Sequence, residues 1–236
     1  MAYWKDWIID SLHQIYGTTR YFHKGGPPQH YLDYVLTDKC PVIILSGLFG
    51  PWQDLKHLAD EISLRGHPTY VIPKLGFNLQ DIPTSAKTVR ELIDENNINN
   101  CVIVAHSKGG LIGKYVLVHF NPDKRVCGMV SIATPYSGLE MADRFPIKSL
   151  LEVGMKSQII ADLKSHSEVN PQIISIAPLY DHLIPQEKGS FLEGAENITV
   201  DVIGHHTVIY RRETRDVIIQ SIEKLSKKFS MGKHQD

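Results

Sequence analysis

Short apolar runs alternate with segments of helical periodicity along most of the chain. The apolar runs predict buried strands at residues 42–45, 69–72, 102–105, 125–133, 173–177 and 198–203. Apolar residues recur at helical spacing at residues 52–65, 83–93, 111–120 and from Ile218 onward. This alternation predicts an α/β fold with a mostly parallel central sheet and helices on both of its faces. Because no internal repeat or low-complexity segment is found, residues 1–236 are interpreted as a single domain.

The first thirty residues are expected to form an amphipathic helix and a loop. Residues 3–16 place five apolar residues at helical spacing before Gly17, which is expected to end the helix: Trp4, Trp7, Ile8, Leu12 and Ile15. The favoured interpretation packs this apolar face on the domain. The alternative, a surface for peripheral lipid contact or a partner chain, rests on the two tryptophans. A polar loop follows over residues 17–30, and residues 31–36 are a candidate edge strand.

One long connection interrupts the alternation. Nearly forty residues, 134–171, separate the strand at 125–133 from the next strand. Apolar positions within them recur at roughly helical spacing, with Gly154 as a break. The favoured interpretation is a helix that covers the sheet after a long lead-in. The alternative is a small helical cap whose apolar residues face an acyl pocket.

Composition and charge exclude several classes of protein. The 236 residues are 42% hydrophobic, and a formal net charge of −1 gives no indication of a nucleic-acid or anionic membrane partner. The scattered Cys40, Cys101 and Cys127 predict reduced, buried thiols. No stretch approaches the roughly 18 apolar residues of a membrane span, and no secretory signal is recognised. A cytoplasmic location is therefore expected, with a secreted origin as the alternative if a signal precedes this sequence.

The candidate chemistry centres on the turn after the strand at 102–105. Ala105-His106-Ser107-Lys108-Gly109 matches a G-x-S-x-G nucleophile elbow with alanine at the first position. Such a turn is strained, and it needs small residues two before and two after the serine because the strand and helix backbones nearly touch there. Ala105 and Gly109 meet that need. The pattern predicts a nucleophilic Ser107, whereas the alternative is a glycine-rich turn with an incidental serine.

A serine nucleophile needs an orienting acid as well as a base. Asp181 is the leading candidate for the acid because it lies in the loop after the strand at 173–177. Asp143, Asp162 and Asp201 are weaker candidates, since none of them follows a strand at the expected place. His182, next to Asp181, is expected to be exposed.

The base is expected after the strand at 198–203, which completes the chain order Ser, Asp, His. Two adjacent histidines, His205 and His206, follow Gly204 at this point. Neighbouring side chains point in different directions, so only one of the two can face Ser107.

These motifs resemble those of the α/β-hydrolases, and most of all the small bacterial lipases and esterases with an Ala-His-Ser-x-Gly-Gly elbow. The resemblance covers residues from about 41 to 225, and besides the elbow it rests on Val42-Ile-Ile-Leu-Ser-Gly-Leu48, Ala133-Thr-Pro-Tyr-Ser-Gly138, Asp181 and Gly204-His205-x-x-Val208. It implies an α/β-hydrolase fold and a catalytic triad of Ser107, Asp181 and His205. His205 is favoured over His206 because the family's catalytic histidine directly follows glycine.

The resemblance also implies an oxyanion hole made of two backbone N–H groups, those of Leu48 and Lys108. The family usually carries His-Gly before the first of these residues, whereas this chain has Ser46-Gly47. Lys108 also departs from the apolar residue or glutamine often found there. The favoured interpretation makes its side chain a salt-bridged surface group, and the alternative is a contact to a negatively charged substrate.

The activity that follows is that of a serine carboxylester hydrolase, a lipase or esterase acting through an acyl-enzyme on a small-molecule ester or lipid. The alternatives are a thioesterase, acyltransferase or amidase with the same triad, or a non-catalytic binding protein with this fold. The sequence has no H-E-x-x-H, Cys-x-x-Cys, P-loop or G-x-G-x-x-G motif. We therefore expect no cofactor and no metal site, and the sequence does not indicate the oligomeric state.

Overall fold

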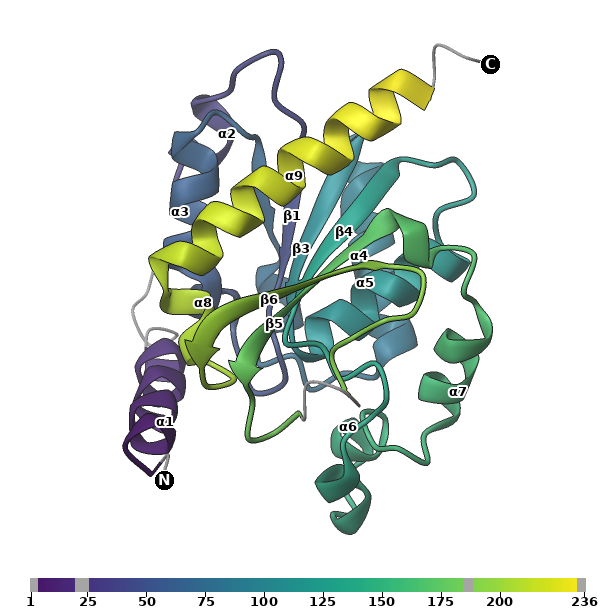
Figure 1. The fold of residues 1–236 in the computed structure, drawn as a ribbon. Coiled ribbons are helices and arrows are strands. Elements are labelled where there is room, and N and C mark those ends of the chain that lie inside the picture. The colour runs from purple at the N-terminus through teal and green to yellow at the C-terminus, as the bar shows by residue number, and fades with distance from the viewer. Residues whose placement is uncertain (1–3, 20–25, 185–188, 233–236) are drawn as a thin grey trace.

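The computed structural model describes residues 4–19, 26–184 and 189–232, and its centre is one six-stranded sheet (Figure 1). All neighbouring strands are parallel, in the order β2-β1-β3-β4-β5-β6. The strands are β1 (Val42–Leu45), β2 (Thr69–Val71), β3 (Cys101–His106), β4 (Val126–Ile132), β5 (Ile173–Tyr180) and β6 (Glu196–Ile203). The six predicted strands and the parallel sheet are thus confirmed, although β5 ends at Tyr180 rather than at residue 177.

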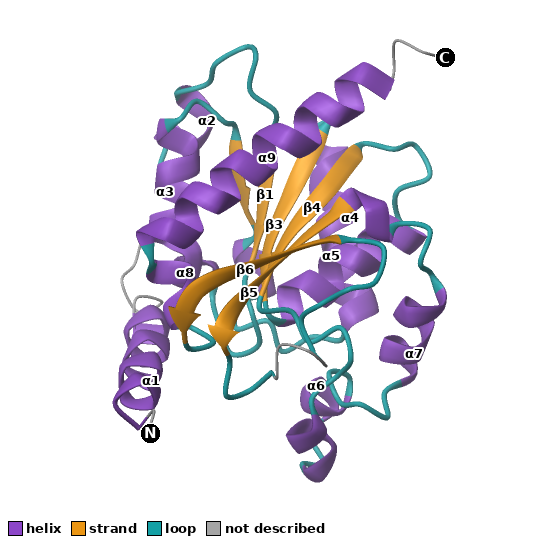
Figure 2. Ribbon diagram, viewed as in Figure 1, coloured by secondary structure: helices purple, strands orange, loops and turns teal. Residues whose placement is uncertain are grey.

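Helices cover both faces of the sheet, as predicted (Figure 2). One face carries α3 (Lys56–Leu64) and α9 (Arg212–Gly232), and the other carries α4 (Ile82–Glu95) and α5 (Lys108–His119). Shorter elements connect them: the 3₁₀ turns η2 (Trp52–Leu55) and η3 (Pro73–Leu75), and the single-turn helix α8 (Thr207–Tyr210). The helix predicted at residues 52–65 is therefore η2 followed by α3.

The strands bury side chains on both faces because the sheet is sandwiched between two helical layers. In β1, Val42 and Ile44 belong to the core cluster under α3 and α9, whereas Ile43 and Leu45 belong to the cluster under α4 and α5. Side chains of a strand alternate between the faces, so one four-residue strand supplies both cores. Cys40, Cys101 and Cys127 are buried, free thiols, as predicted.

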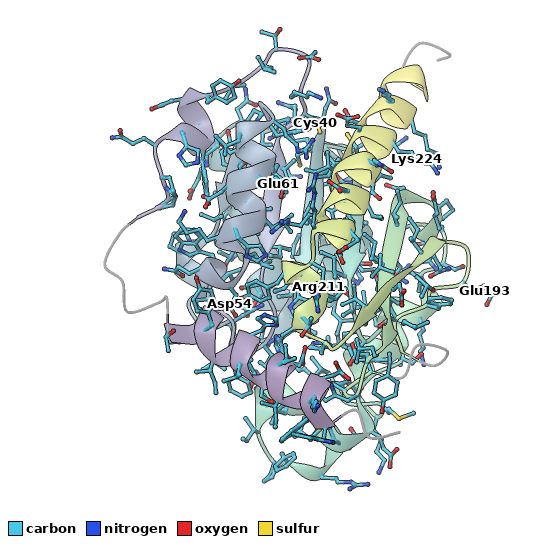
Figure 3. The ribbon with its side chains drawn as sticks, turned by 60° about the vertical axis from the view of Figure 1, so that its left-hand side comes forward. Cys40, Asp54, Glu61, Glu193, Arg211 and Lys224 are labelled. Carbon is cyan, nitrogen blue, oxygen red and sulfur yellow. The ribbon has the colours of Figure 1, made fainter. Side chains whose placement is uncertain are left out.

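The N-terminal helix α1 (Trp4–Thr19) forms, but its orientation contradicts the favoured interpretation. The five apolar residues predicted to pack on the domain are instead exposed, Trp4 and Leu12 at 58% each. Asp10 is the side chain that is buried, with 1% exposure. Figure 3 shows α1 crossing the lower end of the molecule next to η2, which carries the labelled Asp54. The helix thus faces the protein with its polar side and turns its apolar side outward.

The expected edge strand at residues 31–36 is wrong, because the segment begins with one helical turn, α2 (His30–Asp33). Tyr31 explains the difference. Its buried ring packs edge-on against Trp52, and its hydroxyl donates a 2.9 Å hydrogen bond to Asp60 on α3. These partners lie on the helical layer, so the segment packs there instead of extending the sheet beyond β2.

The long connection 134–171 combines several short elements: η4 (Glu140–Arg144), α6 (Lys148–Leu151), α7 (Gln158–Ser165) and η5 (Asn170–Gln172). Ile160 and Leu163 on α7 are buried in the core cluster that also contains α5 residues, which agrees with a sheet-covering helix. Ile147 and Leu151, by contrast, are exposed. Figure 1 shows α6 at the lower end of the molecule, beyond the carboxyl ends of the strands. No helix of the described residues is long and apolar enough to cross a membrane.

Candidate active site

Ser107 occupies a strained turn between β3 and α5. Its backbone angles, φ 54° and ψ −123°, are rarely adopted by residues other than glycine. The turn is so tight that a Cβ atom built on Gly109 would lie 2.5 Å from the carbonyl oxygen of Leu45 on the neighbouring strand β1. Packing of α5 directly against β1 and β3 therefore requires glycine at residue 109 and holds Ser107 in this conformation.

Two hydrogen bonds join the three residues predicted from the sequence, Ser107, His205 and Asp181. The Nε2 atom of His205 lies 3.0 Å from Oγ of Ser107, and its Nδ1 atom lies 2.8 Å from Oδ2 of Asp181. The three residues come from the carboxyl ends of β3, β5 and β6, which meet at one edge of the parallel sheet. Because Nδ1 donates to a carboxylate, Nε2 is left free to accept the serine proton.

The carboxylate of Asp181 is fixed on its other side as well. Its Oδ1 atom accepts hydrogen bonds from the backbone N–H groups of Leu183 at 2.8 Å and Ile184 at 3.0 Å. Of the three weaker candidates for the acid, Asp162 pairs with His119, Asp143 lies 3.5 Å from the backbone nitrogen of Lys156, and Asp201 is exposed on β6.

Burial and charge act in opposite directions on this pair. Burial alone would lower the pKa of His205, but the charge and hydrogen bond of Asp181, together with the charge of Asp10, outweigh it and raise the pKa above 6.5. Burial alone would raise the pKa of Asp181, but the charge and hydrogen bond of His205 and the two backbone donors hold it below its usual value. The site therefore favours an ionised aspartate next to a histidine that protonates readily.

His206 and His106 lie next to His205 but do not take its place between Ser107 and Asp181. His206 makes neither of the two bonds that His205 makes, and its ring lies at right angles to the His205 ring with centroids 5.0 Å apart. Burial, followed by the charge of His205, lowers the pKa of His206 to about 3. His106 is fully enclosed, and burial lowers its pKa well below 6.5. Its Nε2 atom lies 3.0 Å from the backbone oxygen of His205, so a neutral His106 holds the loop that carries His205.

The loop after β1 lies directly beside Ser107. A Cβ atom built on Gly47 would lie 3.1 Å from Cβ of Ser107. The loop closes on itself, because Oγ of Ser46 donates to the oxygen of Gly50 at 2.6 Å. Within the described residues, the N–H groups of Leu48 and Lys108 donate none of the hydrogen bonds of the loops and turns.

The side chain of Lys108 contradicts the favoured interpretation of a salt-bridged surface group. It is buried with 1% exposure, and its Nζ atom donates to the backbone oxygens of Asn78 at 3.1 Å and Gln80 at 2.6 Å. Burial lowers its pKa to about 8. Asn78 in turn donates from Nδ2 to the oxygen of Ser46 at 2.7 Å. Lys108 therefore holds a loop that itself supports the turn beside Ser107.

Asp10 is a residue of the site that the sequence gave no reason to consider. Its Oδ1 atom accepts hydrogen bonds from the backbone N–H groups of His206 and Thr207, both at 2.7 Å. Its Oδ2 atom lies 3.7 Å from Nε2 of His182, which is partly buried rather than exposed as expected. Asp10 thus fixes α1 to the loop that follows His205.

Among the comparisons with known proteins, the one with solved structures supports the fold. No protein-family model matches the sequence, and no curated protein matches it. Several solved structures are similar, among them the mature lipase BlEst2 of Bacillus licheniformis, with a TM-score of 0.64 and 16% identity over 81% of this chain and 95% of that one.

Two further solved structures are similar over nearly the same share of this chain. MGS-MChE2, an α/β-hydrolase from a sediment metagenome of the Mar Chica lagoon, has a TM-score of 0.56 and 19% identity over 79% of this chain and 91% of its own. An extracellular α/β-hydrolase from a Paenibacillus species has a TM-score of 0.53 and 16% identity over 79% and 98%. The expectation drawn from the motifs is confirmed at this level: the chain has the α/β-hydrolase fold.

Proposed function

We propose that this protein is a serine carboxylester hydrolase in which Ser107 is the nucleophile, His205 the general base and Asp181 the residue that orients His205. The observation that carries the proposal is the unbroken hydrogen-bond chain from Oγ of Ser107 through both ring nitrogens of His205 to Asp181. The neighbouring lipases and α/β-hydrolases of known structure support the class of enzyme by fold.

Acylation begins when Nε2 of His205 takes the proton of Ser107 and the serine oxygen attacks the ester carbonyl. The new carbon–oxygen bond forms a tetrahedral intermediate, and the imidazolium gains charge next to ionised Asp181. The raised pKa of His205 favours this charged imidazolium. His205 then gives the proton to the leaving alcohol, which breaks the ester bond and leaves Ser107 acylated. In the second half, His205 deprotonates a water molecule, which attacks the acyl carbon. The bond from that carbon to Oγ of Ser107 then breaks, His205 returns its proton to Oγ, and the carboxylic acid is released.

The negative charge of both tetrahedral intermediates needs donors that are already in position. We assign this role to the backbone N–H groups of Leu48 and Lys108. The close approach of Gly47 to Ser107 supports the first, and the position of Lys108 directly after the nucleophile supports the second. The absence of the family's usual histidine at residue 46 does not remove either main-chain donor.

The outward apolar face of α1 supports a lipid-like substrate or surface. Trp7 and Ile15 on α1 are 56% and 58% exposed, and Ile147 and Met155 in the long connection are exposed as well. Figure 1 places α1 and α6 at the same lower end of the molecule, toward which β5 and β6 point. Tryptophan is favoured at interfaces between water and lipid. A lipid surface would therefore bring its esters to the carboxyl edge of the sheet.

The test is turnover of p-nitrophenyl esters from acetate to palmitate by the wild type and by Ser107→Ala, with Ser11→Ala on α1 as a matched control. We expect Ser107→Ala to lose at least three orders of magnitude in kcat and the control to keep full activity. Equal turnover by Ser107→Ala and wild type would overturn the proposal. A thioesterase, acyltransferase or amidase would also lose its activity in Ser107→Ala. It would turn over a thioester, an added acyl acceptor or an amide faster than the p-nitrophenyl esters.

A further inference from the structure

Two histidines and an aspartate meet where α7 packs on α5, outside the candidate active site. The Nε2 atom of His119, near the end of α5, lies 2.8 Å from Oδ2 of Asp162 on α7. The Nε2 atom of His166, which follows α7, lies 3.8 Å from Oδ1 of the same aspartate. One ligand atom from each of the three residues can be chosen so that all lie within 4.8 Å of one another.

These donors and their spacing fit zinc. Zn²⁺ binds imidazole nitrogen and carboxylate oxygen at about 2.0–2.2 Å in tetrahedral geometry, which separates neighbouring ligand atoms by roughly 3.3 Å. The separations of 2.8 Å from His119 to Oδ2 and 3.8 Å from His166 to Oδ1 of Asp162 lie on either side of that value, and one ion would draw the three ligand atoms toward it. Ca²⁺ and Mg²⁺ prefer sites made of oxygen atoms only, and this cluster has no thiolate for a soft ion such as Cu(I).

A fourth residue orients one of the imidazoles. The Nδ1 atom of His166 lies 2.8 Å from Oε1 of Glu168. When Nδ1 donates to this carboxylate, the lone pair of Nε2 is directed toward Asp162, which is the arrangement that carboxylates give to zinc-binding histidines. The side chains of His119, Asp162 and His166 are 31–38% exposed, so the ion can enter and water can complete its coordination.

We propose that His119, Asp162 and His166 bind one Zn²⁺ ion that fixes the connection between β4 and β5 to α5. Asp162 and His166 are four residues apart and so share one face at the end of α7. His119 lies eleven residues after Lys108, which places it roughly 16 Å along α5 from the start of that helix. The ion would therefore act on the position of α7 and not on the reacting atoms, and the proposal goes beyond the proposed function.

This proposal departs from the sequence-based expectation of no metal site. Short motifs such as H-E-x-x-H reveal a site only when its ligands are close in sequence. His119 is separated from Asp162 by 43 residues, so only the packing of α7 on α5 brings the ligands together.

The experiment uses the full chain after EDTA has removed bound metal. Calorimetric titration with Zn²⁺ measures binding, and thermal unfolding with and without Zn²⁺ measures the change in stability. We expect one saturable site and a melting temperature that rises by several degrees on zinc addition, because the ion binds the folded state. His119→Gln and His166→Gln should each weaken binding more than tenfold and abolish the thermal shift. Glu168→Gln should weaken binding about tenfold. Ca²⁺ should not substitute for Zn²⁺.

His30→Gln is the matched control, since His30 is also partly exposed and lies 3.9 Å from a carboxylate, that of Asp60. It should bind zinc like the wild type. Ser107→Ala should also bind zinc unchanged, so the outcome does not depend on the proposed ester hydrolysis. Absence of a stoichiometric site in the wild type would overturn the proposal. So would a site that His119→Gln and His166→Gln leave intact.

Discussion

The carboxylate of Asp10 on the N-terminal helix accepts a 2.7 Å hydrogen bond from the backbone N–H of His206, the residue that follows His205. The same oxygen accepts a second bond of 2.7 Å from Thr207. The polar side of α1 thereby fixes the loop on which His205 depends, while the apolar side of the helix faces outward. A helix that the sequence indicates only as amphipathic is thus part of the support of the candidate active site.

Replacing Asp10 by asparagine should change the pH dependence of the reaction as well as its rate. The charge of Asp10 contributes to the raised pKa of His205, so its loss should lower that pKa. His205 then stays neutral to lower pH, and the acid limb of kcat/KM should shift to lower pH. We also expect kcat to fall by less than about tenfold, because the amide oxygen of asparagine still accepts both hydrogen bonds but without the charge that strengthens them. Asp6→Asn on the same helix is the control; a rate loss with an unmoved acid limb would contradict this role.

Activity of the wild type should decline on the acid side with an apparent pKa above 6.5. The base must be neutral, and the pKa of His205 is raised. Asp181→Asn removes the charge that raises it and also the acceptor that fixes its tautomer, so kcat should fall by roughly 10³–10⁴. The pH–rate profile of kcat/KM measures the first effect and single-turnover kinetics the second. An acid limb well below pH 6.5 in the wild type would be inconsistent with the ionised pair.

Both members of the same pair should stabilise the fold, with opposite dependence on pH. The lowered pKa of Asp181 gives a contribution that is complete above the unfolded pKa of about 3.9 and is lost as the pH falls. The raised pKa of His205 gives a contribution that is complete below about pH 6.5 and is lost as the pH rises through the folded pKa. The free energies of unfolding of wild type and His205→Gln, measured by urea denaturation at several pH values, should therefore approach each other as the pH rises above about 6.5. A difference that stays constant with pH would argue against the assignment.

Lys108→Met should destabilise the fold although it replaces a charged side chain with an apolar one. It leaves the buried carbonyl of Asn78 without its donor, at about 1–3 kcal/mol, whereas water can reach the carbonyl of the exposed Gln80; relief of the buried charge partly offsets the loss. We expect a net loss of about 2 kcal/mol and a lower kcat, because Asn78 supports Ser46. Lys224→Met is the control, since Lys224 forms an exposed pair with Glu196 that contributes at most about 1 kcal/mol. Equal stability of the two variants would contradict the structural role.

Gly47→Ala should reduce activity without unfolding the protein. The added methyl group would lie 3.1 Å from Cβ of Ser107 and push the loop with Leu48 away. Displacement of about 1 Å at a reacting centre costs up to roughly 10²-fold, so kcat should fall by 10- to 100-fold. Gly26→Ala is the control, because a Cβ atom built there meets nothing within 4 Å. Unchanged kcat in Gly47→Ala would remove support for an oxyanion hole at this loop.

The double substitution Trp4→Gln and Trp7→Gln should separate lipid contact from chemistry. Burial of aromatic surface contributes about 25 cal/mol per Å², so two partly inserted rings should contribute about 2 kcal/mol or more. We expect co-sedimentation with phosphatidylcholine vesicles and turnover of emulsified palmitate to fall more than tenfold, with p-nitrophenyl acetate turnover unchanged. Leu64→Gln on α3 is the control, as Leu64 is 64% exposed. Equal losses on both substrates would refute a role for α1 in lipid contact.

Much of the sheet and the three central residues could be predicted because both depend on local pattern. Apolar runs mark the strands, and Ser107, Asp181 and His205 follow three of those strands in chain order. Periodicity cannot tell which side of a surface helix faces the protein. The pattern favours an inward apolar face for α1, whereas the buried carboxylate of Asp10 decides the orientation.

Contacts with backbone groups could not be predicted at all. Asp10 accepts hydrogen bonds from backbone N–H groups 196 and 197 residues away, and Lys108 donates to two backbone carbonyl oxygens. Because every residue type carries these backbone groups, no sequence motif marks such contacts. Tyr31 illustrates the same limit, because its partner Asp60 lies on α3 and turns a strand-like segment into a helical turn. The choice of His205 over His206, by contrast, follows from the resemblance, in which the histidine comes directly after glycine.

The most direct measurement is labelling of the folded protein with a fluorophosphonate probe, followed by peptide mapping. The activated oxygen of Ser107 should displace fluoride and form one phosphonate ester on the peptide that contains residues 105–109. Labelling should vanish in Ser107→Ala and become very slow in His205→Ala. A folded wild-type protein that stays unlabelled, or one labelled at another serine, would contradict the assignment of Ser107 as the nucleophile.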